Sequence, residues 1–121
     1  ELSKEQILRQ ISATTQLFQS LNIPNVPFFR PPGGRYNNLV LAATQSHSMA
    51  LLMWDVNAAD YKRANGTFPS TQSITKRIVS KIKPGSIVLM HNSPATVKAL
   101  PNIIDQIREK GFSIGKIKWI P

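Results

Sequence analysis

Three short segments of this chain carry side chains capable of chemistry, and each follows an apolar run prone to form a β-strand. Their chemically capable residues are Arg30, Trp54 with acidic neighbours, and His91. The segments span residues 28–34, 54–61 and 89–92. A guanidinium can pair with a carboxylate, and an imidazole can transfer a proton. Because ligands gather at the carboxyl ends of parallel strands, we expect these side chains to contribute to one site.

A repeating pattern of helices and strands must position these segments. Ser3 and Gln6 have the capping-box spacing, and the apolar side chains that follow recur at helical intervals. Helices are predicted over residues 3–20, 36–44, 71–82 and 93–110, and strands over residues 26–29, 49–56, 86–90 and 114–120. We expect Pro101 to kink or split the last helix and Gly111 to terminate it in a left-handed conformation. The order predicts an α/β fold with parallel strands and right-handed crossovers.

The composition limits the classes of protein to consider. A chain of 121 residues with 41% apolar side chains fits one globular domain, and no apolar run approaches the length of a membrane span. The absence of cysteine excludes disulfides, thiolate metal sites and a cysteine nucleophile.

The chain is strongly basic, with a net charge of +9, which favours anionic surroundings such as nucleic acid, a teichoic-acid-bearing wall or acidic glycans. Basic side chains cluster at two places, namely Lys76, Arg77, Lys81 and Lys83, and Lys116 with Lys118. No aromatic side chains alternate with them, so a nucleic-acid-binding module is the weakest of the function classes considered. We expect a solvated basic face or affinity for a cell wall instead.

Residues 30–33 (Arg-Pro-Pro-Gly), 54–61 (Trp-Asp-Val-Asn-Ala-Ala-Asp-Tyr) and 88–91 (Val-Leu-Met-His) together resemble three motifs of the polysaccharide deacetylases. Residues 95–101 and 111–112 also resemble the last helix and strand of that family. This is the NodB-homology family, or carbohydrate esterase family 4, which hydrolyses acetyl groups from chitin, chitooligosaccharides, peptidoglycan or xylan. The resemblance covers nearly the whole chain. It implies that residues 1–121 are the C-terminal portion of a NodB-like domain, which is a distorted (β/α) barrel.

The resemblance also implies a divalent metal, zinc or cobalt, held by an aspartate and two histidines. Those ligands belong to two earlier motifs of the family that this sequence lacks, and His47 and His91 do not have the i, i+4 spacing of the metal pair. We therefore expect a companion N-terminal segment or chain to supply the metal ligands. The implied substrate is an acetylated polysaccharide, and the implied location is extracellular or on a bacterial cell surface. A bare barrel edge predicts that the chain alone is oligomeric or is held by a companion chain.

The resemblance assigns a role to each matching position. Arg30 pairs with the base aspartate of the missing portion, the N–H of Gly33 helps to stabilise the oxyanion, and His91 protonates the leaving amine or alcohol. Leu89 lines the pocket for the acetyl methyl group. Tyr61 replaces the tryptophan that usually forms a wall of the groove, and Trp54 is a second aromatic residue of the substrate site.

Two positions depart from the family pattern. Asn57 stands where an aspartate commonly holds the catalytic histidine in its charged form, and an amide can orient the ring but gives little electrostatic support. Asn92 replaces the acidic residue that often follows the histidine. These departures keep open an alternative function, a non-catalytic glycan-binding or structural remnant of the fold.

Each residue also has a purely structural interpretation. Arg30 could anchor a turn, Trp54 is more typical of a core, and His91 could be a structural histidine at a strand end. Asp55 and Asp60 would ordinarily be solvated loop carboxylates or helix caps. His47 lies in a polar turn and is expected at the surface.

Overall fold

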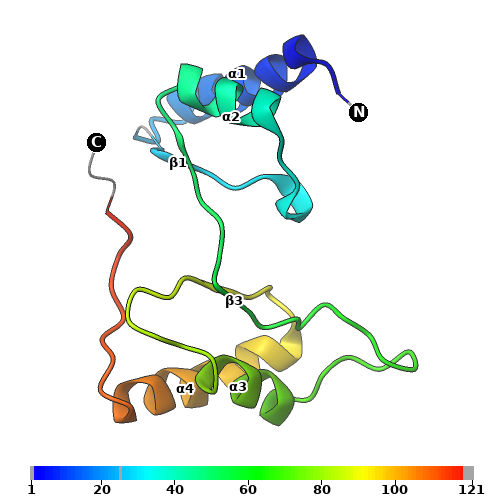
Figure 1. Ribbon diagram of the computed structural model, residues 1–121, viewed down its shortest axis with the longest axis vertical. Coiled ribbons are helices and arrows are strands. Elements are labelled where there is room, and N and C mark those ends of the chain that lie inside the picture. The colour runs from blue at the N-terminus through cyan, green and yellow to red at the C-terminus, as the bar shows by residue number, and fades with distance from the viewer. Residues whose placement is uncertain (1, 25, 119–121) are drawn as a thin grey trace. The chain divides into compact units, whose positions relative to one another are not determined.

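The computed structural model describes residues 2–24 and 26–118, and its compact parts are two units (Figure 1). Unit 1 comprises the described residues up to Met53 together with Lys118, and unit 2 comprises Trp54–Ile117. No helix in these described ranges is long and apolar enough to cross a membrane.

Unit 1 pairs two helices with two short parallel strands. Its elements are α1 (Lys4–Ser20), β1 (Phe28–Phe29), the 3-10 turn η1 (Pro32–Gly34), α2 (Asn38–Ser46) and β2 (Ala50–Leu51). The Ser3 hydroxyl accepts from the Gln6 N–H, and the Gln6 side chain accepts from the Ser3 N–H, which confirms the predicted capping box. A small core of Ile11, Ala43 and Met49 joins the helices to β1.

Unit 2 has the same plan with a larger core. Its elements are β3 (Val56–Asn57), α3 (Thr71–Val79), β4 (Val88–Leu89) and α4 (Pro94–Glu109), and β3 pairs with β4 in parallel. The core consists of the buried side chains of Val56, Ala58, Ile74, Ile78, Ala99 and Ile103. Because α3 and α4 pack on each other over this core, the loops after β3 and β4 are held by well-packed elements.

Parts of the sequence predictions about the elements are wrong. Residues 49–56 were expected to form one strand, but they form the separate strands β2 and β3, which pair in different sheets. Pro101 does not split α4, which continues through it, so that half of the prediction is wrong, while a kink at Pro101 stays a prediction. Proline removes one backbone N–H and leaves a carbonyl one turn earlier, at Val97, without its helical partner. Since Val97 and Pro101 are exposed, that carbonyl can be hydrated.

The end of α4 follows the prediction. Gly111 has a φ of 83°, and its N–H donates to the carbonyl of Arg108, while the N–H of Phe112 donates to the carbonyl of Ile107. The predicted strand over residues 114–120 is absent from its described part, residues 114–118, and its last two residues lie outside the described ranges. The helices and parallel strand pairs support an α/β class, whereas two pairs of strands do not by themselves form a barrel.

Candidate functional site

A buried carboxylate holds His91 in place at the end of β4. His91 follows Leu89 by two residues, and Asp60 lies three residues beyond Asn57, the last residue of the paired strand β3. Oδ1 of Asp60 lies 2.8 Å from Nδ1 of His91, and Oδ2 of Asp60 accepts from the His91 N–H at 2.6 Å. Both contacts are made by the same pair of residues. They therefore fix the backbone and the ring of His91 together.

A chain of hydroxyl groups from α4 completes the surroundings of the carboxylate. The Thr96 hydroxyl donates to Oδ2 of Asp60 at 2.7 Å, and Oγ of Ser93 lies 2.8 Å from Oγ1 of Thr96. Because the single Thr96 hydroxyl proton goes to Asp60, Ser93 is the donor to Thr96. Ser93 is also the N-cap of α4 and accepts from the Thr96 N–H. The start of α4 thus supplies the N-cap of the helix, Ser93, and a hydrogen-bond donor to the Asp60 carboxylate, Thr96.

The environment of Asp60 keeps its carboxyl ionised. The residue is only 1% exposed. Burial on its own raises the pKa of the Asp60 carboxyl, but the hydrogen bonds from Thr96, from the His91 N–H and from the His91 ring outweigh it, so the pKa lies below its ordinary value of 3.8. An ionised Asp60 accepts from Nδ1–H of His91. The other ring nitrogen, Nε2, is therefore left to exchange a proton with a ligand.

The His91 ring remains accessible. Its side chain is 44% exposed, and Tyr61 lies edge-to-face against it with ring centroids 5.0 Å apart. Tyr61 is 48% exposed and directly follows the buried Asp60. One turn of chain therefore places a hidden carboxylate behind the ring and an open aromatic surface beside it.

Asn57 has a different role from the one that the sequence suggested. Its side-chain oxygen accepts from the N–H of Ala59 at 2.7 Å, and Ala59 has a φ of 50°. This local bond stabilises a tight turn, of the kind that asparagine favours, and the turn delivers Asp60 to His91. The expectation that Asn57 orients the His91 ring is wrong, because the ring nitrogen is bonded to Asp60. The expectation that Asp60 is solvated is wrong for the same reason.

The remaining residues of unit 2 that the sequence selected differ in exposure. Leu89 is 6% exposed within β4, and Trp54 is half-buried just before β3. Asp55 is exposed and accepts from the N–H of Ile87 at 2.8 Å, so it ties the starts of the two strands together. Arg77, which the sequence grouped with a solvated basic face, donates from Nη1 to the carbonyl of Ala58 at 2.6 Å. That bond braces the turn that leads to Asp60.

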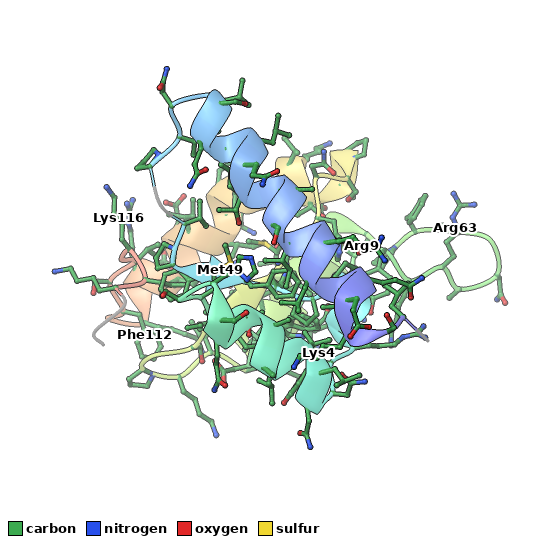
Figure 2. The ribbon with its side chains drawn as sticks, turned by 90° about the horizontal axis from the view of Figure 1, so that it is seen from above. Lys4, Arg9, Met49, Arg63, Phe112 and Lys116 are labelled. Atoms are coloured by element: carbon green, nitrogen blue, oxygen red, sulfur yellow. The ribbon has the colours of Figure 1, made fainter. Side chains whose placement is uncertain are left out.

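A stiffened loop follows Tyr61 and extends away from the helices of unit 2 (Figures 1 and 2). Ala64 and Thr67 exchange two backbone hydrogen bonds of 3.0 Å around Asn65 and Gly66, both of which have positive φ. The guanidinium carbon of Arg63 lies 4.2 Å from the centre of the Phe68 ring. The loop is therefore a short hairpin with a cation stacked on its base.

The corresponding strand end of unit 1 carries Arg30. Its side chain is exposed, and no described residue hydrogen-bonds or ion-pairs with its guanidinium. The suggestion that Arg30 anchors the turn through its guanidinium is therefore not borne out within the described ranges. Gly33 lies in η1 with a φ of 65°, a conformation that suits glycine. Arg30 also lines a largely apolar cavity of about 860 Å³ in unit 1, together with Phe29, Pro31 and Met49.

His47 is more constrained than a surface turn residue. It is the C-cap of α2 and is half-buried. Its Nδ1 lies 3.1 Å from the carbonyl oxygen of Ala43, and its Nε2 lies 2.9 Å from Oγ of Ser12 on α1. The carbonyl can only accept, so Nδ1 carries the proton and Ser12 donates to Nε2. His47 thus links the two helices of unit 1.

Comparison with known proteins places this chain in a family. The polysaccharide deacetylase family model matches residues 1–52. A family 4 carbohydrate esterase from Streptomyces lividans, solved with acetate, is 30% identical with a TM-score of 0.84, over 97% of this chain and 58% of that one. The chain belongs to the polysaccharide deacetylase family. Membership supports the resemblance that was drawn from the three motifs.

Two further relatives show the functional range of the polysaccharide deacetylases. A peptidoglycan-N-acetylglucosamine deacetylase of Bacillus cereus is 29% identical over 92% of this chain and 40% of its own length. A family 4 pseudoenzyme from Bacillus anthracis is 32% identical with a TM-score of 0.83, over 92% of this chain and 38% of that one. The chain spans 16% to 40% of the length of the first curated relatives it matches.

The donor set in the described residues does not suit a metal ion. No three His, Cys, Asp or Glu side chains of residues 2–24 and 26–118 lie close enough together to hold one. His91 and Asp60 bind each other, and His47 is bound to Ser12 and to a backbone carbonyl. The described residues therefore contain no ligand set for the metal on which the family generally depends.

Proposed function

We propose that this chain contributes to the hydrolytic site of a polysaccharide deacetylase, with His91 as the proton donor to the leaving group. The observation that carries the proposal is the buried Asp60 carboxylate, which holds Nδ1 of His91 at 2.8 Å and leaves Nε2 for the substrate. Relatives of the chain are deacetylases of peptidoglycan and xylan, which supports an acetylated polysaccharide as substrate.

The proposed chemistry is the cleavage of an acetyl group by water. When the bond between the acetyl carbon and the sugar nitrogen or oxygen breaks, the departing atom takes the proton from Nε2 of His91, and acetate is released. The ionised Asp60 stabilises the positive ring before that transfer. Asp60 therefore acts as a positioning residue through His91, in the part that the sequence had given to Asn57.

Other residues of the chain have supporting parts in this proposal. Tyr61 offers a face of the groove on which a sugar ring can stack, with Trp54 as a second aromatic side chain. Arg30 would pair with the base carboxylate of a companion segment, and the N–H of Gly33 would donate to the oxyanion. Leu89 would back the pocket for the acetyl methyl group.

The proposal requires partners outside these residues. A companion N-terminal segment would complete a distorted (β/α) barrel and bring the ligands of a divalent metal, zinc or cobalt. The apolar cavity beside Arg30 in unit 1 supports such a companion, since an uncovered apolar surface favours association. We place the activity outside the cell or at the cell surface, where glycans of the kind named for the relatives occur.

Reconstitution tests the proposal. This chain would be co-expressed with a segment that carries the family's Asp-Asp and His-x-x-x-His motifs, and acetate release from chitooligosaccharide, peptidoglycan and acetylxylan would be measured with zinc and with cobalt. We expect His91→Ala to lower kcat by about 10²- to 10⁴-fold. His47→Ala is the matched control, because the chain has two histidines and His47 belongs to the contact between α1 and α2. Activity that is absent, or equally sensitive to both changes, would refute the proposal.

The second candidate function is a glycan-binding protein without hydrolytic activity. The similarity to the Bacillus anthracis protein favours it, since that relative has the fold and is named a pseudoenzyme. It predicts that the reconstituted protein sediments with insoluble chitin or peptidoglycan, that Arg30→Ala and His91→Ala leave this binding unchanged, and that no acetate is released.

A further inference from the structure

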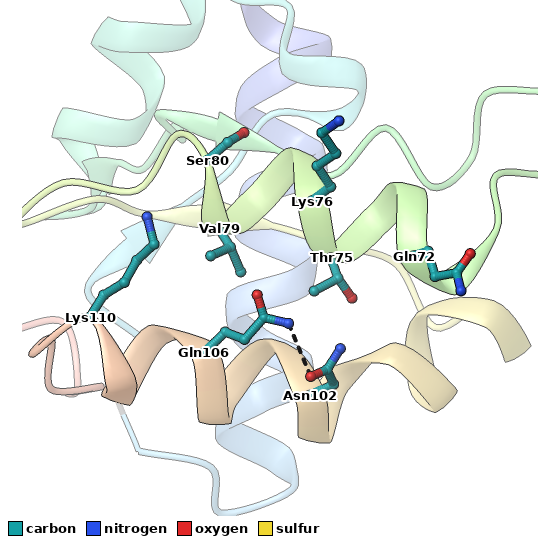
Figure 3. A pocket seen from close by; sticks show the side chains of 8 residues that line it. All are labelled: Gln72, Thr75, Lys76, Val79, Ser80, Asn102, Gln106 and Lys110. Atoms are coloured by element: carbon teal, nitrogen blue, oxygen red, sulfur yellow. Dashed lines mark hydrogen bonds between the residues drawn. The ribbon is translucent and has the colours of Figure 1, made fainter.

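A polar groove runs between α3 and α4 on unit 2, and it shares no residue with the surroundings of His91 (Figure 3). Its volume is about 480 Å³. The eight lining residues are Gln72, Thr75, Lys76, Val79, Ser80, Asn102, Gln106 and Lys110. Gln72 is eight positions from the C-cap Ser80, and Asn102 is eight positions from the C-cap Lys110, so each wall is about 12 Å long. The groove is long enough to take several functional groups of one ligand.

The lining has a distinct chemical character. It offers two ammonium groups, three amides and two hydroxyls, with Val79 as its single apolar side chain. It includes no carboxylate, although α4 carries Asp105 and Glu109 on its neighbouring positions. It also includes no aromatic ring, so neither a nucleobase nor the flat face of a sugar can stack there. These groups suit a flexible ligand that carries both hydroxyls and negative charge.

Thr75 shows that the groove is more than a set of surface side chains. The residue is only 5% exposed, and its hydroxyl has no hydrogen-bond partner among the described residues. No fully enclosed side-chain oxygen or nitrogen in the described ranges lacks a partner, so the Thr75 oxygen is open to the groove. Figure 3 shows this oxygen on the side that faces α4 and Asn102. A hydroxyl in such a position gains from a ligand that supplies a hydrogen bond.

Two amides on α4 are aligned on the opposite wall. Nε2 of Gln106 donates to Oδ1 of Asn102 at 3.0 Å (Figure 3). This bond leaves the amide N–H groups of Asn102 as donors and the carbonyl oxygen of Gln106 as an acceptor. Figure 3 places Lys110 at one end of the groove and Gln72 at the other, and it shows the Lys76 side chain extending from α3 on the side away from α4. One cation therefore lies at an end of the row of neutral hydrogen-bonding groups, and a second lies on the outer side of α3.

We propose that this groove binds a polyol phosphate polymer. Its phosphates would pair with Lys76 and Lys110, and its hydroxyls would bond to Thr75, Asn102 and Gln106. Lysine binds phosphate as a point charge, and the amides and hydroxyls provide the neutral partners that a polyol requires. A surface that holds such a polymer would retain the protein on an anionic matrix independently of any hydrolytic activity.

Binding of poly(glycerol phosphate) to the 121-residue chain tests the proposal, at an ionic strength of about 0.15 M, where surface charges are screened beyond roughly 8 Å. We expect Lys76→Gln with Lys110→Gln to weaken binding about tenfold, as the loss of charge-assisted contacts predicts. The control is Lys81→Gln with Lys83→Gln, which removes the same charge from exposed residues that do not line the groove. We expect less than a twofold change in that control.

A neutral substitution separates a built site from general charge attraction. Thr75→Val keeps the shape and the net charge, and we expect it to weaken binding about threefold. If this variant melts at a lower temperature, Asn102→Ala on the exposed wall replaces it in the same measurement. Glycerol 3-phosphate and inorganic phosphate are measured in parallel, and weaker binding of both would assign the site to the polymer.

Several outcomes would overturn the proposal. No binding of the polymer would do so, as would an equal loss in the Lys81 and Lys83 control. Unchanged binding in both Thr75→Val and Asn102→Ala would mean that net charge alone attracts the polymer. Binding of RNA as tight as that of the polymer, with the same loss in the groove variants, would assign the groove to nucleic acid.

Discussion

The strand end at His91 and the strand end at Arg30 differ in how much of their surroundings the chain itself provides. His91 is held by a buried carboxylate that accepts three hydrogen bonds, and all of the groups involved lie between residues 60 and 96. Arg30 is exposed, with no partner for its guanidinium among the described residues. The comparison teaches that unit 2 itself provides the partners that hold His91, whereas the described residues provide no partner for the Arg30 guanidinium.

Replacement of Asp60 should have the largest effect on this difference. Asp60→Ala leaves a backbone N–H, a ring N–H and a hydroxyl without their acceptor, so we expect the free energy of unfolding to fall by about 3 kcal/mol. Denaturant titration of the chain measures it. Asp55→Ala is the matched control, since Asp55 is an exposed carboxylate with one backbone donor, and a loss of only about 1 kcal/mol is expected. Equal losses would contradict the account of a preformed site.

The pH dependence of the free energy of unfolding should distinguish the contribution of the Asp60 charge from that of the side chain's shape. Because folding lowers the pKa of Asp60 below 3.8, the ionised carboxylate stabilises the fold above that value, and this contribution is lost as the pH falls through the folded-state pKa. The free energy of unfolding between pH 6 and pH 2.5 should therefore fall less steeply for Asp60→Asn than for the unchanged chain. Parallel curves for the two proteins would show that Asp60 is not the group responsible.

Thr96→Val should have a smaller effect than either change at Asp60. It preserves the volume of the side chain but removes one donor to the carboxylate and one acceptor for Ser93. We expect the free energy of unfolding to fall by about 1.5 kcal/mol. In the reconstituted enzyme, the pH profile of kcat should also shift, because the charge of Asp60 supports His91. A stability loss with an unchanged profile would leave Thr96 a purely structural residue.

Arg30→Ala should have the smallest effect on stability, within about 0.5 kcal/mol, because it removes an exposed side chain that has no partner in the described part of the chain. With the companion segment present, the same change should lower the activity and weaken the association of the two parts. A large loss of stability in the chain alone would show that Arg30 already has a structural function in unit 1.

Local signals in the sequence were sufficient for much of the fold. The capping box at Ser3 and the left-handed Gly111 depend on neighbours three or four residues away, and both were predicted. The break between β2 and β3 could not be predicted in the same way. An apolar run from residue 49 to residue 56 is compatible with one strand, and only the packing of two separate cores divides it.

Of the two residues at the centre of the candidate site, the sequence indicated His91 but not the part of Asp60, because the partners of Asp60 are distant in the chain. His91 stands out because it ends an apolar run, but nothing in the residues near Asp60 indicates that its carboxylate is buried. Its partners, His91 and Thr96, lie 31 and 36 residues further along the chain. The one local signal was the spacing from Asn57, whose side chain stabilises the turn at Ala59. Read as a turn-former, Asn57 would have directed attention to Asp60.

The hairpin that follows Tyr61 has a consequence for protein engineering. Its ends are closed by the paired backbone of Ala64 and Thr67, and Arg63 rests on the Phe68 ring at its base. Extra residues inserted between Asn65 and Gly66 would therefore lengthen an exposed tip while the base stays closed. The tip is a natural place to graft a recognition peptide, and the geometry of Asp60 and His91 should survive the graft.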